Sequence, residues 1–423
     1  MRVCQLKLHC FRNYRDLTLD PGEGLNILHG ENAQGKTNIL EAIFLLATTR
    51  SPRVSRDSEL IHHGAEAAHV TAEIEREQEG DAELQISVQQ GDRKTVRING
   101  MKRERVLDLL GQFNAVSFGA IDLKIITGEP ADRRHFLNVE ISQVSPRYVY
   151  DLGHYKRVLA NRNRLLKDLR ERPRYIEESG LDAWDEQLIC YGTRLLQKRQ
   201  FYIERLSPLA DQVQRELTDG KEGLEIQYVP SFPLPSNLPV EERKASTSDS
   251  TVAVNLNDTE AVAQRFREQL IACRMEEIRR GTTLIGPQRD DLCFRINGAD
   301  ARIYGSQGQQ RTVVLALKLA EFQLIQNLVG EPPVMLLDDV MSDLDDARRQ
   351  HLLRWVQRRC QTFLTCTSLN AFPKEILAGA RTFCVVAGTV TPDARGKTEK
   401  TARSRRKEQP VEEIASNGVR ATS

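Results

Sequence analysis

The chain begins with an alternation of apolar and polar positions that is typical of β-strands. The alternation runs through residues 3–20 and is broken by a polar stretch at Arg12–Asp16, which predicts two strands joined by a turn. Residues 25–29 (LNILH) predict a third, apolar strand. After a glycine-bearing loop, a helix is predicted from about Lys36 through the apolar run ILEAIFLLAT. The first segment therefore predicts the order strand, loop, helix.

Strand-like alternation returns further along the chain. It covers residues 68–76 and 82–98, where Asn99-Gly100 marks a tight hairpin turn. These strands follow one another with short connections, so we expect an antiparallel meander. From about 131 to 225 the spacing of apolar residues becomes helical and charges become frequent, which predicts two or three long helices.

The remaining pattern predicts an α/β fold that is interrupted by the helices. Residues 230–257 are rich in Pro, Ser, Asn and Thr and predict a long surface loop. Beyond it, helices are predicted at 258–280, 308–328 and 345–359, and strands at 283–297, 334–338, 362–367 and 381–387. We therefore expect a head made of residues 1–130 and 258–390, an inserted helical arm at 131–257, and a disordered basic tail at 391–423.

Composition narrows the choice of partners only slightly. Lys and Arg number 60 against 59 Asp and Glu, for a net charge of +1, so a nucleic-acid surface would have to be a local patch. The first residues lack the apolar core of a signal peptide, and no run of 18 apolar residues predicts a membrane span. The eight cysteines form no Cys-x-x-Cys pair. We expect a cytoplasmic protein with reduced cysteines and no membrane partner.

The loop between the third strand and the first helix matches a phosphate-binding motif. Its sequence follows the pattern G-x-x-x-x-G-K-[ST]. The two glycines let successive backbone N–H groups point at phosphate oxygens, and the helix dipole adds positive potential. Lys36 is expected to reach the terminal phosphates as a catalytic residue, and Thr37 to bind Mg²⁺. The candidate ATP-binding residues of this loop are Gly30, Glu31, Asn32, Ala33, Gln34, Gly35, Lys36 and Thr37.

Two acids end the apolar strand predicted at 334–338. The run VMLLDD places Asp338 and Asp339 at the carboxyl end of that strand, where ligands bind in open α/β sheets. We expect Asp338 to hold Mg²⁺ and Asp339 to orient or deprotonate the attacking water. About 300 residues separate these acids from Lys36. That gap fits an ATPase head with a large insertion.

A second glycine-bearing loop meets a helix N-terminus at YGSQGQQR, residues 304–311. Ser306, Gln307 and Gly308 are candidate nucleotide-binding residues, with Gln309 as a further catalytic candidate, because a helix N-terminus attracts anions. An ordinary N-capping turn would give the same sequence. One chain would then carry two phosphate-facing loops and one pair of acids. A head-to-tail dimer, in which this loop closes on ATP held by the other copy, accounts for both.

These motifs, taken in order, resemble the RecF family of ABC-type ATPases. The resemblance rests on GENAQGKTNILEAI, TLIGPQRDDL, YGSQGQQRT and LLDDVMSDLD, supported by FRNY, LLATTRSPR and ITGEPADRRHFLN, and covers roughly residues 1–390. It implies a P-loop ABC-type head with a split mixed sheet and a short helical arm. It also implies ATP-dependent dimerisation, slow hydrolysis, binding of double-stranded and gapped DNA, and RecR and RecO partners that assist recombinase loading. Arg12 and Tyr14 are implied neighbours of the base.

The sequence departs from the family pattern in one loop and one strand. Phe118 is followed by Gly-Ala-Ile-Asp, without the Pro and Glu that the family shows there, and the strand at 362–367 is not followed by a switch histidine. Thr365 or Thr367 is the candidate for that switch position.

A DNA-binding surface is predicted on the arm. Residues 147–174 hold nine basic residues and three acids, a net charge of +6, although a solvated basic helix face would look the same. Arg133 and Arg134 form a second candidate pair. The nine basic residues are Arg147, Lys156, Arg157, Arg162, Arg164, Lys167, Arg170, Arg172 and Arg174.

Three other protein classes share parts of this pattern. The ATP-binding subunit of a membrane transporter would have an uninterrupted head and a switch histidine. An SMC-type architectural protein would have hundreds of heptad residues in place of this short arm. A repair nuclease would need a further metal-binding domain. The pattern of this chain favours a DNA-associated ATPase.

Overall fold

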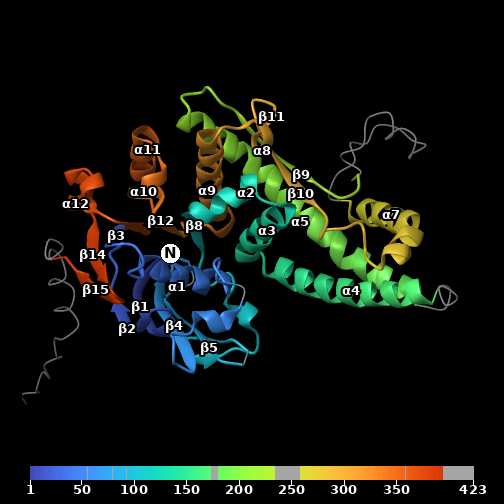
Figure 1. Ribbon diagram of the computed structural model, residues 1–423, viewed down its shortest axis with the longest axis horizontal. Helices are drawn as coiled ribbons and strands as arrows, with labels where there is room; N and C mark the ends of the chain where they lie inside the picture. The colour runs from blue at the N-terminus through green and yellow to red at the C-terminus, as the bar shows by residue number, and fades with distance from the viewer. Residues whose placement is uncertain are drawn as a thin grey trace, which may run out of the picture.

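The protein consists of a β-rich head and a helical arm that projects from it (Figure 1). The fold is known from a computed structural model. It describes residues 1–393 except 55, 79, 92, 173–179, 234–257 and 358.

An antiparallel sheet forms one side of the head. Its strands are ordered β2-β1-β4-β5-β6-β7, and alternate residues along β4 and β5 are buried, as expected for a sheet with one face on the core. The predicted meander is therefore confirmed. The strands are β1 (Arg2–Phe11), β2 (Tyr14–Leu19), β4 (Ala67–Glu75), β5 (Ala82–Gln89), β6 (Thr95–Ile98) and β7 (Met101–Lys102).

A second sheet carries the predicted nucleotide motifs. Its order is β15-β14-β3-β13-β12-β8, and every neighbouring pair is parallel except β14 with β15. Two of its strands precede the arm and four follow it, so the predicted split is confirmed. The strands are β3 (Leu25–His29), β8 (Ala115–Gly119), β12 (Val334–Asp338), β13 (Thr362–Cys366), β14 (Arg381–Val386) and β15 (Thr389–Pro392).

The parallel sheet is buried on both faces, which explains its continuous apolar runs. Along β12, Val334 and Leu336 pack into the core shared with helix α1 (Lys36–Thr48), whereas Met335 and Leu337 pack into the core shared with helix α9 (Gln307–Val329). The sheet therefore lies between the helix that follows the phosphate loop and the helix that follows the second glycine loop.

One helix of the described chain, α9, is long and apolar enough to cross a membrane by composition. Of its most apolar 18-residue stretch, 72% is buried inside the protein. It is therefore the central helix of the head.

The arm is built from long helices that buried arginines hold in place. Arg162 donates to Asp185 at 2.6 Å and to Glu277 at 2.7 Å, and Arg199 donates to the backbone oxygen of Pro287 at 2.6 Å. Removing one partner would leave a buried charge unpaired, so these contacts fix the arm. The long helices are α3 (Pro130–Val144), α4 (Pro146–Glu171), α5 (Leu181–Leu217) and α7 (Thr259–Arg280), and the short α2 (Lys124–Thr127) precedes them. Helix α7 packs with these arm helices, although its residues were predicted as part of the head.

Three details correct the sequence-based expectations. Strand β9 (Leu224–Val229) lies inside the stretch predicted as helical arm and pairs with β10 (Asp291–Ile296). Strands were expected over 283–297, but β10 covers only the second half of that stretch. Strand β15 extends to Pro392, so the predicted disorder does not begin at Thr391. The remainder of the predicted tail and most of the predicted 230–257 loop lie outside the described residues.

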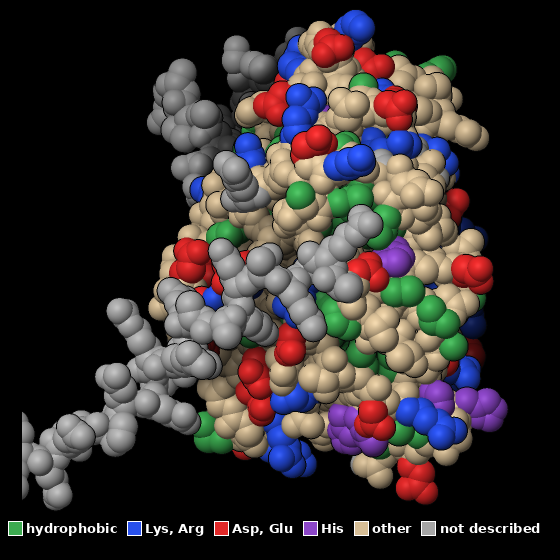
Figure 2. Space-filling model, turned by 90° about the vertical axis from the view of Figure 1, so that its left-hand side faces the viewer, with side chains coloured by type: hydrophobic (Ala, Val, Ile, Leu, Met, Phe, Trp, Pro, Cys, Tyr) green, Lys and Arg blue, Asp and Glu red, His purple; other side chains and the backbone are tan. Residues whose placement is uncertain are grey.

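The other elements connect these layers. They are β11 (Ala299–Asp300), α8 (Ala301–Tyr304), α10 (Val340–Asp343), α11 (Asp346–Val356), α12 (Lys374–Ala378) and the 3₁₀ turns Asp57–Leu60, Val106–Leu109, Ala120–Leu123 and Leu369–Ala371. Charges of both signs are mixed over the face of the head seen in Figure 2, which agrees with the near-zero net charge.

Candidate nucleotide-binding site

The phosphate loop adopts a backbone that needs its glycines. Gly30 has a φ of 151° and Gly35 a φ of 112°, values that other residues rarely adopt. A Cβ on Gly30 would overlap the backbone oxygen of Val385, and one on Gly35 would overlap the side chain of Asn13. The glycines are therefore required both by conformation and by close packing.

Two other turns hold the loop from outside. The Tyr14 hydroxyl donates to the backbone oxygen of Gly35 at 3.0 Å, and Asn13 Nδ2 donates to that of Gln34 at 3.0 Å. From the β14–β15 turn, the backbone N–H of Ala387 donates to Gln34 Oε1 at 2.6 Å. These contacts join the loop to segments that are distant in sequence.

Lys36 lies across the loop at the start of α1. Its Nζ donates to the backbone oxygens of Gly30 and Glu31, both at 2.7 Å, and the residue is only 8% exposed. The N-terminal N–H groups of α1 add a positive potential to that of the amine. The loop can therefore receive an anion with several phosphate oxygens.

Thr37 and Asp338, which were predicted to share a metal, lie in direct contact. Thr37 Oγ1 donates to Asp338 Oδ1 at 2.8 Å, and Thr365 Oγ1 donates to the same oxygen at 2.8 Å. Hydroxyl and carboxylate oxygens are the ligands that Mg²⁺ prefers, so this donor set fits the ion. Gly119 of β8 lies beside Asp338, where a Cβ would come within 3.3 Å of the aspartate Cβ.

Asp339 has a conformation that few aspartates adopt. Its φ is 53°, it is exposed, and its backbone N–H donates to Thr365 Oγ1 at 2.9 Å. Thr365 thus contacts both acids, which supports its assignment over Thr367 as the switch-position residue. Strained backbone of this kind occurs often at functional sites.

The second glycine loop begins helix α9 with a reciprocal cap. Ser306 Oγ accepts from the backbone N–H of Gln309 at 3.2 Å, while Gln309 Oε1 accepts from the backbone N–H of Ser306 at 2.9 Å. Gln309 Nε2 also donates to Glu222 Oε1 at 2.9 Å. The Gln309 side chain therefore holds the loop in shape, whereas Ser306, Gln307 and Gly308 are exposed.

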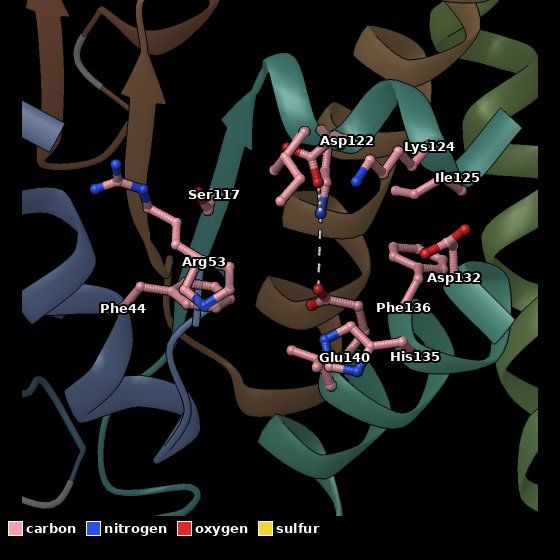
Figure 3. A pocket seen from close by; sticks show the side chains of 14 residues that line it. Phe44, Arg53, Ser117, Asp122, Lys124, Ile125, Asp132, His135, Phe136 and Glu140 are labelled. Atoms are coloured by element: carbon pink, nitrogen blue, oxygen red, sulfur yellow. Dashed lines mark ion pairs between the residues drawn. The ribbon is translucent and has the colours of Figure 1, made fainter. Parts of the chain in front are cut away.

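A pocket of about 330 Å³ adjoins the loop that departs from the family pattern (Figure 3). At its wall, Asp122 Oδ2 accepts from the backbone N–H of Gly119 at 2.8 Å, and the buried Lys318 of α9 lies 3.6 Å from Asp122 Oδ1. Lys318 also lies 3.0 Å from Glu321 and 3.7 Å from Glu140. Burial raises the pKa of Asp122 and of Glu321.

This buried charge cluster was missed from the sequence. Lys318 and Glu321 stand in the otherwise apolar run TVVLALKLAEF, and charges in such a run are the available signal because buried charges must be paired. Through Asp122, which accepts from Gly119 at the end of β8, the cluster links α9 to a strand that is paired with β12.

Several residues that were predicted to contact the nucleotide base or DNA make contacts within the protein instead. Tyr14 is fully buried and so cannot stack on a base. Arg12 donates to both carboxylate oxygens of Glu41, at 2.9 and 2.6 Å. Of the predicted DNA-binding residues, Arg162 is buried in its ion pairs, and Arg133 is buried and bonded to Asp291 at 2.6 Å. These two arginines hold the fold and do not face DNA.

The basic residues that remain on α4 are largely exposed. The pKa of Lys156 is lowered first by partial burial and then by the positive charges of Arg50 and Arg199. Lys156 therefore lies close to Arg50, which follows α1 in sequence. Arg174 lies outside the described residues. The exposed basic residues are Arg147, Lys156, Arg157, Arg164, Lys167, Arg170 and Arg172.

Comparison with known proteins agrees with this geometry. The family described as "RecF/RecN/SMC N terminal domain" matches residues 2–385. The DNA replication and repair protein RecF of Symbiobacterium thermophilum is 42% identical over 397 residues, covering 94% of this chain and all of that protein. The protein of the same name from Cyanothece sp. is 40% identical, covering 92% and 98%.

Solved structures show the same fold. A structure described as the recombination mediator protein RecF with ATP in the RecFOR pathway superposes with a TM-score of 0.80 at 33% identity, covering 93% of this chain and 97% of the other. The Smc head of Pyrococcus furiosus superposes with a TM-score of 0.50 at 18% identity, a likeness of fold alone. The fold, the ordered motifs and these similarities together show that the chain belongs to the RecF family of ABC-type ATPases.

Proposed function

We propose that this protein binds and slowly hydrolyses ATP as a switch that closes a dimer on DNA during recombinational repair. The observation that carries the proposal is the contact between Thr37 and Asp338 beside a phosphate loop that is held from three sides. A RecF protein with a very similar fold has been solved with ATP.

Each residue of the loop has a role that follows from its position. The backbone N–H groups at the start of α1 and the Lys36 amine bind the phosphates. Bound Mg²⁺, held by Thr37 and Asp338, would neutralise charge that develops on the phosphate oxygens. Asp339, exposed beside Asp338, accepts the proton of the attacking water.

The exposed second loop supports a dimer. Ser306, Gln307 and Gly308 present a helix N-terminus to solvent, and such an end binds anions. In a head-to-tail pair, this loop of one copy closes on ATP held by the other. Hydrolysis then removes the phosphate that both copies hold, and the dimer opens.

The DNA-binding surface is proposed on α4 and on the loop after α1. Lys156 and Arg50 lie near one another, because the positive charge of Arg50 lowers the pKa of Lys156 after the larger effect of burial. A backbone phosphate would relieve this repulsion. Double-stranded and gapped DNA are the proposed ligands, and proteins of the RecR and RecO type are the proposed partners in loading a recombinase in the cytoplasm.

Sedimentation tests the switch directly. Analytical ultracentrifugation with ATP and Mg²⁺ should show a dimer, and the protein without nucleotide should remain a monomer. Lys36→Met, which removes the phosphate-binding amine, should stay monomeric. If the unaltered protein had the same mass with and without ATP, the switch mechanism would be wrong. DNA binding would then need another explanation.

A further inference from the structure

Helices α4 and α5 present a surface that neither ATP nor duplex DNA accounts for. Three aromatic rings and three arginines alternate along it, and we call it the aromatic–arginine stripe. Its members are Arg147 and Tyr150 of α4 and Tyr191, Arg194, Phe201 and Arg205 of α5.

Each ring of the stripe already has a cation lying against it. The guanidinium of Arg147 is 5.3 Å from the centroid of Tyr150, and that of Arg205 is 3.9 Å from the centroid of Phe201. Arg194 lies 5.9 Å from the Tyr191 ring. A nucleic-acid base would have to compete with these cations for the ring faces.

The stripe is fixed before any partner arrives. Asp151, which is only 3% exposed, accepts from Arg147 Nε and from Arg194 Nη1, both at 3.3 Å. His154 bridges the two tyrosines, with ring centroids 4.3 Å from Tyr150 and 5.0 Å from Tyr191. Side chains that are already ordered lose little entropy on binding, which favours affinity.

The stripe is also accessible and positively charged. Tyr150 is 40% and Phe201 39% exposed, so a partner can reach both rings. Lys198 adds a further cation 5.5 Å from the Phe201 ring, so Phe201 has two cations beside it, while Asp151 pairs with Arg147 and Arg194. Half-exposed Tyr and Phe beside Arg match the composition of protein interfaces more closely than that of a solvated helix face.

The stripe shares Arg147 with the basic residues predicted to bind DNA, but it faces away from three others on α4. At 100° per residue, Tyr150 and His154 lie on one flank of α4, whereas Lys156, Lys167 and Arg170 lie on the other. Lys156 lies near Arg50 of the head, whose charge lowers its pKa after the larger effect of burial. A partner could therefore occupy the stripe while DNA occupies the other flank.

We propose that the aromatic–arginine stripe docks an acidic segment of a partner protein, with carboxylates on its arginines and aliphatic side chains against the ring edges. Complementary charge would speed the encounter, and the fixed rings would hold the complex. The proposal rests on the mediator role proposed above, because it assigns a surface to the partners of that role.

The test uses the full chain and a charge-reversed variant. Lys198→Glu with Arg205→Glu changes two exposed cations, and Lys221→Glu with Lys374→Glu is the matched control, since both of its positions are exposed too. Binding to purified RecO and to purified RecR of the same organism is measured by calorimetry. ATP-dependent dimerisation and affinity for a duplex oligonucleotide are measured on the same samples.

We expect the stripe variant to bind at least one of the two proteins about tenfold more weakly or worse, while dimerisation, duplex affinity and the control stay unchanged. Unchanged binding to both proteins overturns the docking surface and leaves the mediator role intact. Loss of duplex affinity alone would make the stripe a DNA surface, and a changed oligomeric state would make it a contact between copies. If the unaltered protein binds neither RecO nor RecR, the mediator role fails as well. Phe201→Ser, which retains the charges, is the second variant and should weaken the same complex.

Discussion

The two glycine loops of the head differ in how completely one chain builds them. The loop at 30–37 is held by Asn13, Tyr14 and Ala387 from two distant turns. The loop at 305–310 is held by its own helix cap and by Glu222, and Ser306 to Gly308 remain exposed. Both loops stand at a helix N-terminus, but only the first also has a lysine and an acid pair beside it.

This difference indicates whether each loop can function within one chain or needs a second copy. A loop fixed from several sides within one chain is ready to bind without rearrangement. A loop whose anion-facing end meets only solvent depends on a second surface. The first loop should therefore be sensitive to changes that affect folding of the monomer, and the second to changes that affect only the assembled dimer.

The largest expected effect separates hydrolysis from binding at the first loop. Asp339→Asn should lower the rate of ATP hydrolysis by about 10²–10⁴-fold, because the amide cannot accept the proton of water. ATP affinity should change little, since Asp338 and Thr37 are untouched. Single-turnover hydrolysis and nucleotide titration measure the two quantities. Asp345→Asn, at the exposed cap of α11, should leave both unchanged; equal losses in the two variants would argue against the assigned role.

A smaller effect is expected at the second loop. Ser306→Arg places a long cation where the loop would meet the other copy, and should weaken ATP-dependent dimerisation about tenfold or more. Nucleotide binding by the monomer should persist, because Ser306 is remote in sequence from Lys36 and contacts its own helix. Ultracentrifugation and fluorescent-nucleotide binding test this pair. Loss of monomer binding would mean that both loops act within one chain.

Matched glycine substitutions test the two loops separately. Gly30→Ala should lower the free energy of unfolding by about 1–3 kcal/mol, because it forces an unfavourable φ and an overlap with Val385. In Gly308→Ala the nearest atom to the new Cβ is Ser306 Oγ at 4.0 Å, so the monomer should be as stable as before. Dimerisation should weaken instead. Chemical denaturation measures the free energy of unfolding of both variants. An equal loss in the two would contradict the difference proposed between the two loops.

Local motifs made most of the site predictable from sequence. The phosphate loop and the acids of β12 follow from glycine conformation and from an apolar strand that ends in carboxylates, both of which are local features. The contact between Thr37 and Asp338 was predictable because both stand at the same edge of a parallel sheet. The exposed position of the second loop stays consistent with the predicted dimer.

Features that depend on distant packing were not predictable. Arg162 and Arg133 look like surface cations in a basic helix, yet both are buried by acids from α5, α7 and β10. Strand β9 pairs with β10, about 65 residues later in the chain, so no local pattern predicted this pairing. The role of Gln309 in the cap also requires Glu222, which belongs to another segment.

The smallest expected effect concerns Gln309, which the sequence suggested as catalytic and the structure places in the cap of α9. Gln309→Ala removes both hydrogen bonds to Ser306 and Glu222, and should lower stability by about 1 kcal/mol, as other lost caps do. Dimerisation should weaken modestly, because Ser306 is then less well held, and turnover within the dimer should be nearly retained. Thermal denaturation and hydrolysis at saturating protein distinguish the roles. A large loss of turnover without a loss of stability would show that Gln309 acts on ATP itself, and the second loop would then contribute chemistry as well as contact.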